Sequence, residues 1–204
     1  TCLAFDGFST GYNFYDLNAK ISLQPNPSDR FFLSLFSGDD KLMLNYSNAF
    51  IMPDIKSFQH NKWGNLLGAA RWEHSFSPRT VANTRLSFTR YRFLDEDFYR
   101  NKKEVSGYSN VYRSRIRDIG LNSDLDFYIS NFWQVKTGGN LVLHYFEPGN
   151  LSTRQYAGEQ VYLKKDFNNA SRIWETSLYA EYSVSIQKLS FNAGMRLAGY
   201  FLPG

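Results

Sequence analysis

The sequence predicts an all-β protein, an antiparallel up-and-down meander of about eight long strands. Two observations predict this fold class: apolar and polar residues alternate with a period of two over long stretches, and short segments rich in turn-forming residues separate many of these stretches. Successive side chains of a strand point to opposite faces, so each stretch would have one apolar and one polar face. No segment longer than a turn keeps the helical period of 3.6 residues, so almost no helix is expected.

Five stretches alternate clearly, and each predicts a strand. In the first, at residues 12–24, Leu17 and Ile21 are apolar, whereas Asp16 and Lys20 are polar. The same contrast recurs at residues 112–129, 132–146, 175–184 and 189–197. Three less regular stretches, at residues 30–37, 63–75 and 81–93, complete the expected set of strands.

The connections alternate between short and long. The short ones, at residues 25–29, 77–79, 130–131 and 185–187, are built mainly from Pro, Asn, Ser and Asp, which favour turns. The long ones, at residues 38–62, 94–112 and 147–173, are rich in charge and in Asn, Ser and Gly, and we expect them to be loops. In a meander this places every short turn at one end of the sheet and every long loop at the other.

Composition excludes several classes of protein. The chain has 204 residues, of which 43% are hydrophobic, so there is enough apolar surface for a folded structure. No apolar stretch approaches the ~18 residues that a membrane-spanning helix needs. A single cysteine, Cys2, excludes an internal disulfide framework and a cysteine-based zinc site. The net charge of +4 is small and scattered, which argues against nucleic-acid binding.

Alternating strands fit either a soluble β-protein or a transmembrane barrel with its apolar face toward lipid. Strand length favours the barrel, because most stretches reach the ~9–11 residues needed to cross a bilayer, whereas soluble strands are most often ~5–6 residues long. Aromatic residues also cluster at both ends of the stretches, as in the interfacial belts of membrane proteins. We therefore expect the meander to be part of a larger transmembrane β-barrel.

The alternation assigns the side chains to two faces. The expected lumen-facing residues are Asp16, Asn18, Lys20, Asp118, Asn122, Asp124, Asp126, Gln134, Lys136, Asn140, Glu181 and Arg196. The expected lipid-facing residues are Leu17, Ile21, Leu121, Leu125, Leu141, Leu143, Leu178, Leu189 and Phe191. Eight strands can close into a narrow barrel, but so many charges inside one would need nearly complete pairing, which favours a wider barrel.

Several segments have a characteristic strand composition: YNFYDLNAK at 12–20, DRFFLSLFSG at 29–38, WGN at 63–65, ARW at 70–72, TRYRF at 89–93 and FNAGMRL at 191–197. These segments resemble the barrel strands of TonB-dependent outer-membrane receptors of the Bacteroidota type. The resemblance implies a barrel of about 22 strands around a plug. Residues 1–204 would be a single segment of that barrel, without the plug domain, the TonB box or a signal peptide.

The same resemblance implies a location in the cell outer membrane and uptake of a scarce ligand such as a siderophore, haem, a glycan or a peptide. The implied partners are outer-membrane lipid, the TonB complex through the plug-bearing part of such receptors, and a surface lipoprotein; no nucleic acid and no cofactor are expected. Two alternatives remain open from the residues alone. One is a complete eight-stranded membrane barrel that acts as an anchor or adhesin, and the other is a soluble β-barrel that binds a ligand inside.

Other candidate sites have simpler interpretations. His60, His74 and His144 are too far apart in sequence for a local metal motif, and we expect them to be ordinary polar residues. The acidic residues at 118–126 could bind a cation, but we expect them to line the lumen and to pair with Lys136, with Arg71 or with groups of the plug. Residues 95–97 (Asp-Glu-Asp) are expected at a solvated loop tip. Three Asn-X-Ser sequons, at residues 45, 150 and 169, are interpreted as chance. No catalytic arrangement stands out, so the protein is not expected to be an enzyme.

Overall fold

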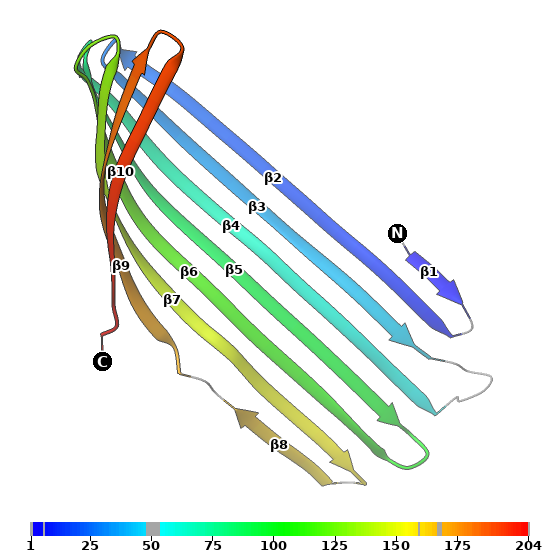
Figure 1. Ribbon diagram of the computed structural model, residues 1–204. Helices are drawn as coiled ribbons and strands as arrows, with labels where there is room; N and C mark the ends of the chain where they lie inside the picture. The colour runs from blue at the N-terminus through cyan, green and yellow to red at the C-terminus, as the bar shows by residue number, and fades with distance from the viewer. Residues whose placement is uncertain (1, 6, 48–53, 159, 167–168, 204) are drawn as a thin grey trace.

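The computed structural model describes residues 2–5, 7–47, 54–158, 160–166 and 169–203, and its strands form one antiparallel sheet (Figure 1). The strands are β1 (Cys2–Phe5), β2 (Phe8–Asn26), β3 (Asp29–Tyr46), β4 (Ile55–Ser77), β5 (Thr80–Asn101), β6 (Ser106–Tyr128), β7 (Trp133–Ala157), β8 (Gln160–Asp166), β9 (Ser171–Ile186) and β10 (Leu189–Phe201). The described residues contain no helix. The prediction of an all-β up-and-down meander is confirmed, and each of the eight expected stretches falls on one of the eight long strands, except that Ile129 and Phe132 lie one residue beyond the ends of β6 and β7.

Neighbouring strands in the sheet are also neighbours in the sequence, with one exception. The short strand β8 pairs with the far end of β7, from Leu151 to Ala157, while β9 pairs with the rest of β7, from Trp133 to Phe146. The sheet is open, because β10 pairs only with β9 and β1 pairs only with β2.

The short connections are tight turns, as the sequence predicts. At the turn between β2 and β3, the Asn26 side-chain oxygen accepts hydrogen bonds from the backbone N–H groups of Ser28 and Asp29, at 2.9 and 2.8 Å. Ser77 and Ser130 accept similar bonds at the next two turns. These side chains satisfy backbone donors that the strand ladder leaves free, which is why Asn and Ser favour turns.

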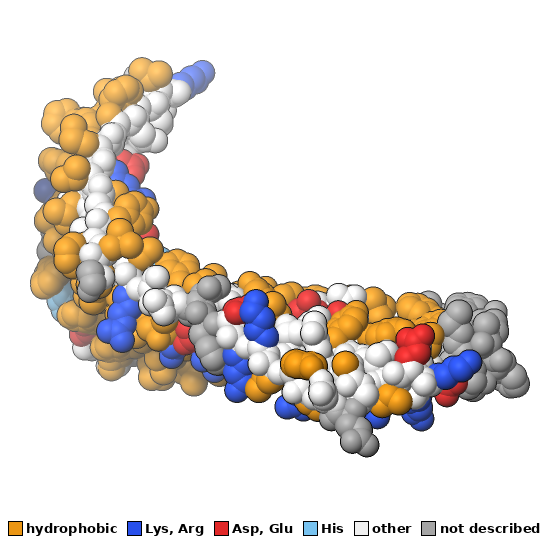
Figure 2. Space-filling view, turned by 90° about the horizontal axis from the view of Figure 1, so that it is seen from below, with side chains coloured by type: hydrophobic (Ala, Val, Ile, Leu, Met, Phe, Trp, Pro, Cys, Tyr) orange, Lys and Arg blue, Asp and Glu red, His pale blue; other side chains and the backbone are white. Residues whose placement is uncertain are grey.

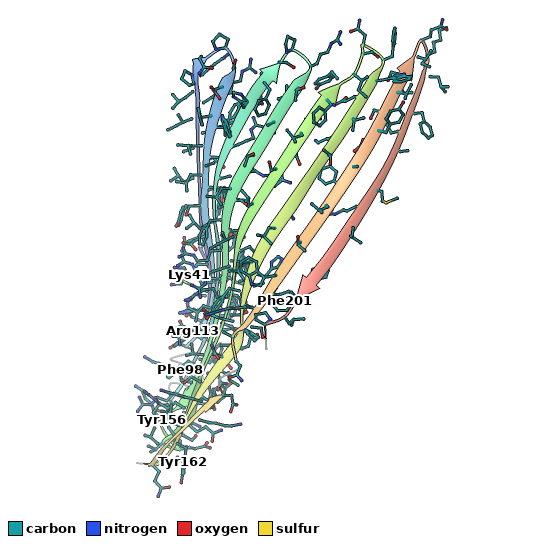
Figure 3. The ribbon with its side chains drawn as sticks, turned by 90° about the vertical axis from the view of Figure 1, so that its left-hand side faces the viewer. Lys41, Phe98, Arg113, Tyr156, Tyr162 and Phe201 are labelled. Atoms are coloured by element: carbon teal, nitrogen blue, oxygen red, sulfur yellow. The ribbon has the colours of Figure 1, made fainter. Side chains whose placement is uncertain are left out.

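The expectation of three long loops is wrong. Residues 38–46, 55–62, 94–101, 106–112 and most of 147–166 continue the ladders of β3 to β8, so the connection between β5 and β6 is only residues 102–105. Polar and charged side chains occupy both faces of this part, so the two-residue contrast that marks a strand is lost. Pairing with long neighbouring strands stabilises the extended conformation despite that composition. We call this part of the sheet the ribbon extension; it is formed by the described residues within 39–64, 91–116 and 147–166. Figure 3 shows it running from Lys41 and Arg113 through Phe98 to Tyr156 and Tyr162.

The sheet is a single curved layer without a core. Among the described side chains no hydrophobic residue is buried. The accessible surface is 14400 Å², whereas a compact monomer of 23.7 kDa exposes about 9,800 Å². Figure 2 shows a crescent whose strongly curved arm carries apolar side chains along its outer side.

Candidate functional site

Strand register divides the side chains into two faces. Residues directly opposite each other on paired strands lie on the same face, so the pairing can be followed across the sheet. Starting at Ile21, it leads to Leu33, Ala70, Leu86, Leu121 and Leu141. All nine expected lipid-facing residues lie on this side of the sheet, which we call the apolar face. That this face meets lipid stays a prediction.

All twelve expected lumen-facing residues lie on the opposite side, which we call the polar face. Asn18 leads through the register to Thr89, Asp118 and His144, and Ser22 leads to Asn122 and Asn140. That this face lines a lumen stays a prediction as well.

Curvature makes the two faces differ in exposure. On β9, Leu178 of the apolar face is 66% exposed, whereas its neighbour Ser177 on the polar face is 3% exposed. On β10, Met195 of the apolar face is 81% exposed. Side chains converge on the concave side of a bent sheet and spread apart on the convex side. The polar face is therefore concave along β9, and the apolar face is the outer side of the crescent.

The polar face carries a hydrogen-bond network across β5 to β10. His144 bridges two carboxylates, with its Nδ1 2.9 Å from Asp118 Oδ1 and its Nε2 3.2 Å from Glu175 Oε2. Thr89 donates to Asp118 at 3.1 Å, and Arg196 lies 3.9 Å from Glu175. The network links five neighbouring strands, so it fixes the positions of charged groups on the concave side.

The acidic residues at 118–126 have other partners than expected. Asp124 accepts hydrogen bonds from Tyr179 and from Asn122, and Asp126 accepts one from Gln134 at 3.1 Å. Within the described residues, no ion pair joins any of these acids to Lys136 or Arg71, and Asp118 instead pairs with His144; pairing with plug groups stays a prediction. Arg71 instead lies over the Phe32 ring at 4.0 Å. Tyr179, Asn122 and Gln134 therefore supply the donors, although Lys136 lies directly opposite Asp126 on β7.

The three histidines occupy separate places. His60 lies in the ribbon extension, 3.0 Å from Asn45 Oδ1, and His74 lies near a short turn, 2.7 Å from Asp29. The described part of the chain contains no group of three or more His, Cys, Asp or Glu residues placed to hold a metal ion. In the same described ranges, no helix is long and apolar enough to cross a membrane.

Aromatic and acidic side chains gather on the polar face of the ribbon extension and of the adjoining end of β2. Tyr12 lies 6.4 Å from Trp63, and Phe93 lies 6.2 Å from Tyr112, measured between ring centroids. Farther along, Tyr99 and Tyr108 stack at 5.8 Å. These rings form an aromatic platform across β2, β4, β5 and β6. A platform of this kind can bind the flat faces of sugars, aromatic groups or peptide side chains.

Acidic groups lie within the platform. Asp40 accepts a hydrogen bond from Tyr12, and Asp97 lies close to Tyr108. Burial, followed by the nearby carboxylate of Asp97, raises the pKa of Tyr108 above its usual range. Asp95 Oδ1 is buried without a hydrogen-bond partner. Residues 95–97 are therefore part of β5, with Asp95 and Asp97 on the polar face, and not the solvated loop tip that the sequence suggested.

The aromatic belts are only partly where expected. Trp72, Trp133 and Trp174 lie on the apolar face, and Phe31 stacks against Trp72 at 6.4 Å. By contrast, Tyr12, Phe14, Trp63 and Phe93 lie on the polar face and belong to the platform or its edge. Sequence analysis missed the platform because it grouped these rings by position along the strand. For Tyr12 and Phe14 the sequence does contain the signal. Both are an odd number of residues away from Leu17 on the same strand, so their side chains lie on the face opposite that of Leu17.

Comparison of the chain with protein-family models finds no matching family, and comparison with curated proteins finds no similar sequence. The fold and the two faces are therefore the observations on which a function can be proposed.

Proposed function

We propose that this chain forms part of the barrel wall of a TonB-dependent outer-membrane transporter that imports a scarce ligand through a plugged barrel. The observation that carries the proposal is the extensive apolar face, which has no protein cover in the described structure and lies opposite a polar, hydrogen-bonded face. In water such a surface would be unfavourable at about 25 cal/mol per Å² of apolar area. In a bilayer the same surface contacts acyl chains.

The dimensions of the apolar surface support this proposal. On β9 the apolar face runs from Trp174 through Leu178 to Ile186. This stretch is about 40 Å long at ~3.4 Å per residue, or roughly 30 Å along the bilayer normal at a tilt near 40°. Outer-membrane barrels have an apolar band of about 25 Å. Tryptophan occurs at both ends of the apolar stretch of β7 and β9, at Trp133 and Trp174, which is typical of interfacial belts.

The open edges favour a wide barrel over a closed one of eight strands. The edge of β10 opposite β9, and most of the free edge of β2, have no strand partner in the described sheet. Backbone groups within a bilayer must all be hydrogen-bonded, so further strands are needed at both edges. In such a wall the platform of the ribbon extension would lie at one mouth of the barrel on its inner side, where it could capture a siderophore, haem, a glycan or a peptide.

The proposal is tested on the full-length protein that contains this chain. We expect it in the outer-membrane fraction, resistant to extraction by urea, and we expect it to bind the purified periplasmic domain of TonB, measured by calorimetry. Membrane retention without TonB binding would support an anchor or adhesin instead. Recovery in the soluble fraction without detergent would contradict every membrane interpretation and favour a soluble ligand binder.

A further inference from the structure

The apolar face changes chemistry abruptly where the ribbon extension begins. Its last apolar row contains Leu35, Phe88, Ile119 and Leu143. The next three rows, which begin on β2 at Leu17, Tyr15 and Asn13, contain eight Lys or Arg residues but only two carboxylates. We call the cations of these rows the basic collar. The three rows together have a net charge of +6, which exceeds the +4 of the whole chain, so the positive charge is concentrated at this boundary.

The two carboxylates of these rows do not neutralise the collar. Asp39 is held by Arg92 at 2.6 Å, and Glu147 is shared by Arg115 at 3.2 Å and Arg117 at 2.6 Å. Arg90 and Arg172 form no ion pair with any described residue.

Two guanidinium groups of the collar also have unused donors. The Nε atoms of Arg90 and Arg117, which are directly opposite each other on β5 and β6, are buried and have no hydrogen-bond partner. Because these Nε atoms are covered by protein, an anion such as phosphate would be bound by the outer nitrogen atoms of the guanidinium groups, which favour bidentate contacts.

A hollow in the apolar face lies next to the collar. It has a volume of about 530 Å³, lies over β2 to β6 and includes Leu33, Leu35 and Gly68. A Cβ atom added at Gly68 would meet nothing within 4 Å, so the hollow is open at its centre. Phe88 and Ile119 also line a second hollow of about 380 Å³, which ends at Arg117, Tyr145 and Arg172.

The arginines at the end of the second hollow are held in place by one ring. The guanidinium groups of Arg117 and Arg172 lie 4.3 and 5.6 Å from the centroid of Tyr145. Stacking on an aromatic ring orders a guanidinium group before a ligand binds. In Figure 2, Lys and Arg side chains recur along the outer, lower side of the long arm, continuous with the apolar side chains of the curved arm.

We propose that this surface is a binding site for one anionic membrane lipid. The lipid phosphate binds between Arg90, Arg117 and Arg172, and an acyl chain lies in the hollow over Gly68. The apolar hollow and the hollow that ends at Arg117 and Arg172 adjoin at Phe88 and Ile119 on one face, which matches a molecule with a hydrocarbon tail and a phosphate head. The inference rests on the proposed membrane location, because the apolar face must be in a bilayer for a lipid to reach it.

The test is native mass spectrometry of the full-length protein, purified in a non-ionic detergent and incubated with phosphatidylglycerol. We expect one retained lipid per protein. R90Q/R172Q should lower the retained fraction by about tenfold or more, as expected for two basic residues beside an anionic lipid. The matched control is R71Q/R85Q, which removes two arginines from β4 and β5 on the polar face and should leave binding unchanged.

Three further binding measurements identify the chemical group that the site recognises. Phosphatidylcholine with the same chains should bind at least about tenfold less, because its headgroup has no net charge. G68F, which fills the hollow, should weaken binding of the long-chain lipid but not of dihexanoyl phosphatidylglycerol. Excess inorganic phosphate should not displace the lipid. Equal binding of the two lipids, equal effects of the two double variants, or displacement by free phosphate would each overturn the proposal.

Folding and location are checked separately for every variant, by the shift in gel mobility of the unheated barrel and by membrane fractionation. A folded protein in the membrane that retains no lipid contradicts only the lipid site. A protein outside the membrane contradicts the proposed function itself.

Discussion

Placing a charge in the middle of the apolar face is the perturbation with the largest predicted effect. Leu178 lies near the middle of the apolar stretch of β9, with 66% of its surface exposed, and Leu141 lies on the neighbouring strand β7, one row before the last apolar row. If the face contacts acyl chains, Arg at either position must enter hydrocarbon, which costs about 2–4 kcal/mol near the midplane. This corresponds to about a 30- to 700-fold loss in the folding equilibrium constant.

The same substitutions have a small effect if the apolar face is exposed to water. Leu→Arg at a surface position changes stability by about 0.5 kcal/mol or less. The assay is urea-induced unfolding in lipid vesicles, followed by tryptophan fluorescence and by gel mobility. Asn140→Arg is the matched control, because Asn140 adjoins Leu141 on β7 but lies on the polar face, and we expect it to be tolerated. Equal tolerance of all three substitutions would refute the reasoning.

Three further predictions concern the turns, the extension and the polar network. Hydrogen bonds from His74, Asn26 and Trp72 at the short turn hold the pKa of Asp29 at about 2. This carboxylate therefore stabilises the fold above about pH 4 and loses its contribution as the pH falls to about 2. Between these pH values, the urea midpoint of Asp29→Asn should change less than that of the unmodified protein. Gly107→Ala should lower the free energy of unfolding by about 1–3 kcal/mol, because the new Cβ would lie 2.5 Å from the Tyr99 backbone oxygen. Gly199→Ala is the control: its Cβ would meet nothing within 4 Å, so it should be nearly neutral in the same unfolding assay. His144→Phe should lower the free energy of unfolding by about 1–3 kcal/mol, because it leaves Asp118 and Glu175 without their shared partner. An unchanged urea midpoint would show that the network does not contribute to stability.

Alternation was sufficient to predict the strands and the division into faces. The contrast between Leu17 and Asp16, or between Leu141 and Asn140, follows from a strand period of two, and register then extends one assignment across the sheet. The turns were predictable for an equally local reason, since Asn26 can bond its own backbone two and three residues on.

The ribbon extension could not be predicted from local patterns. Asp95, Glu96 and Asp97 give no contrast between faces, and their extended conformation depends on paired neighbours farther away in sequence, such as Asn61 opposite Asp95. The partners of the acidic residues were missed for a related reason. Asp124 meets Tyr179, 55 residues later, only because β7 and β9 come together beside β6.

The solvent at the apolar face can be measured directly with spin labels at adjacent residues of β7. In a Cys2→Ser background, the full-length protein in lipid vesicles is labelled at Leu141→Cys or at Asn140→Cys. The relaxation of each label is measured with oxygen, which concentrates in hydrocarbon, and with a water-soluble nickel chelate. The bilayer assignment predicts that the label at 141 responds mainly to oxygen and the label at 140 mainly to nickel. The same response at both positions, or the reverse order, would contradict it.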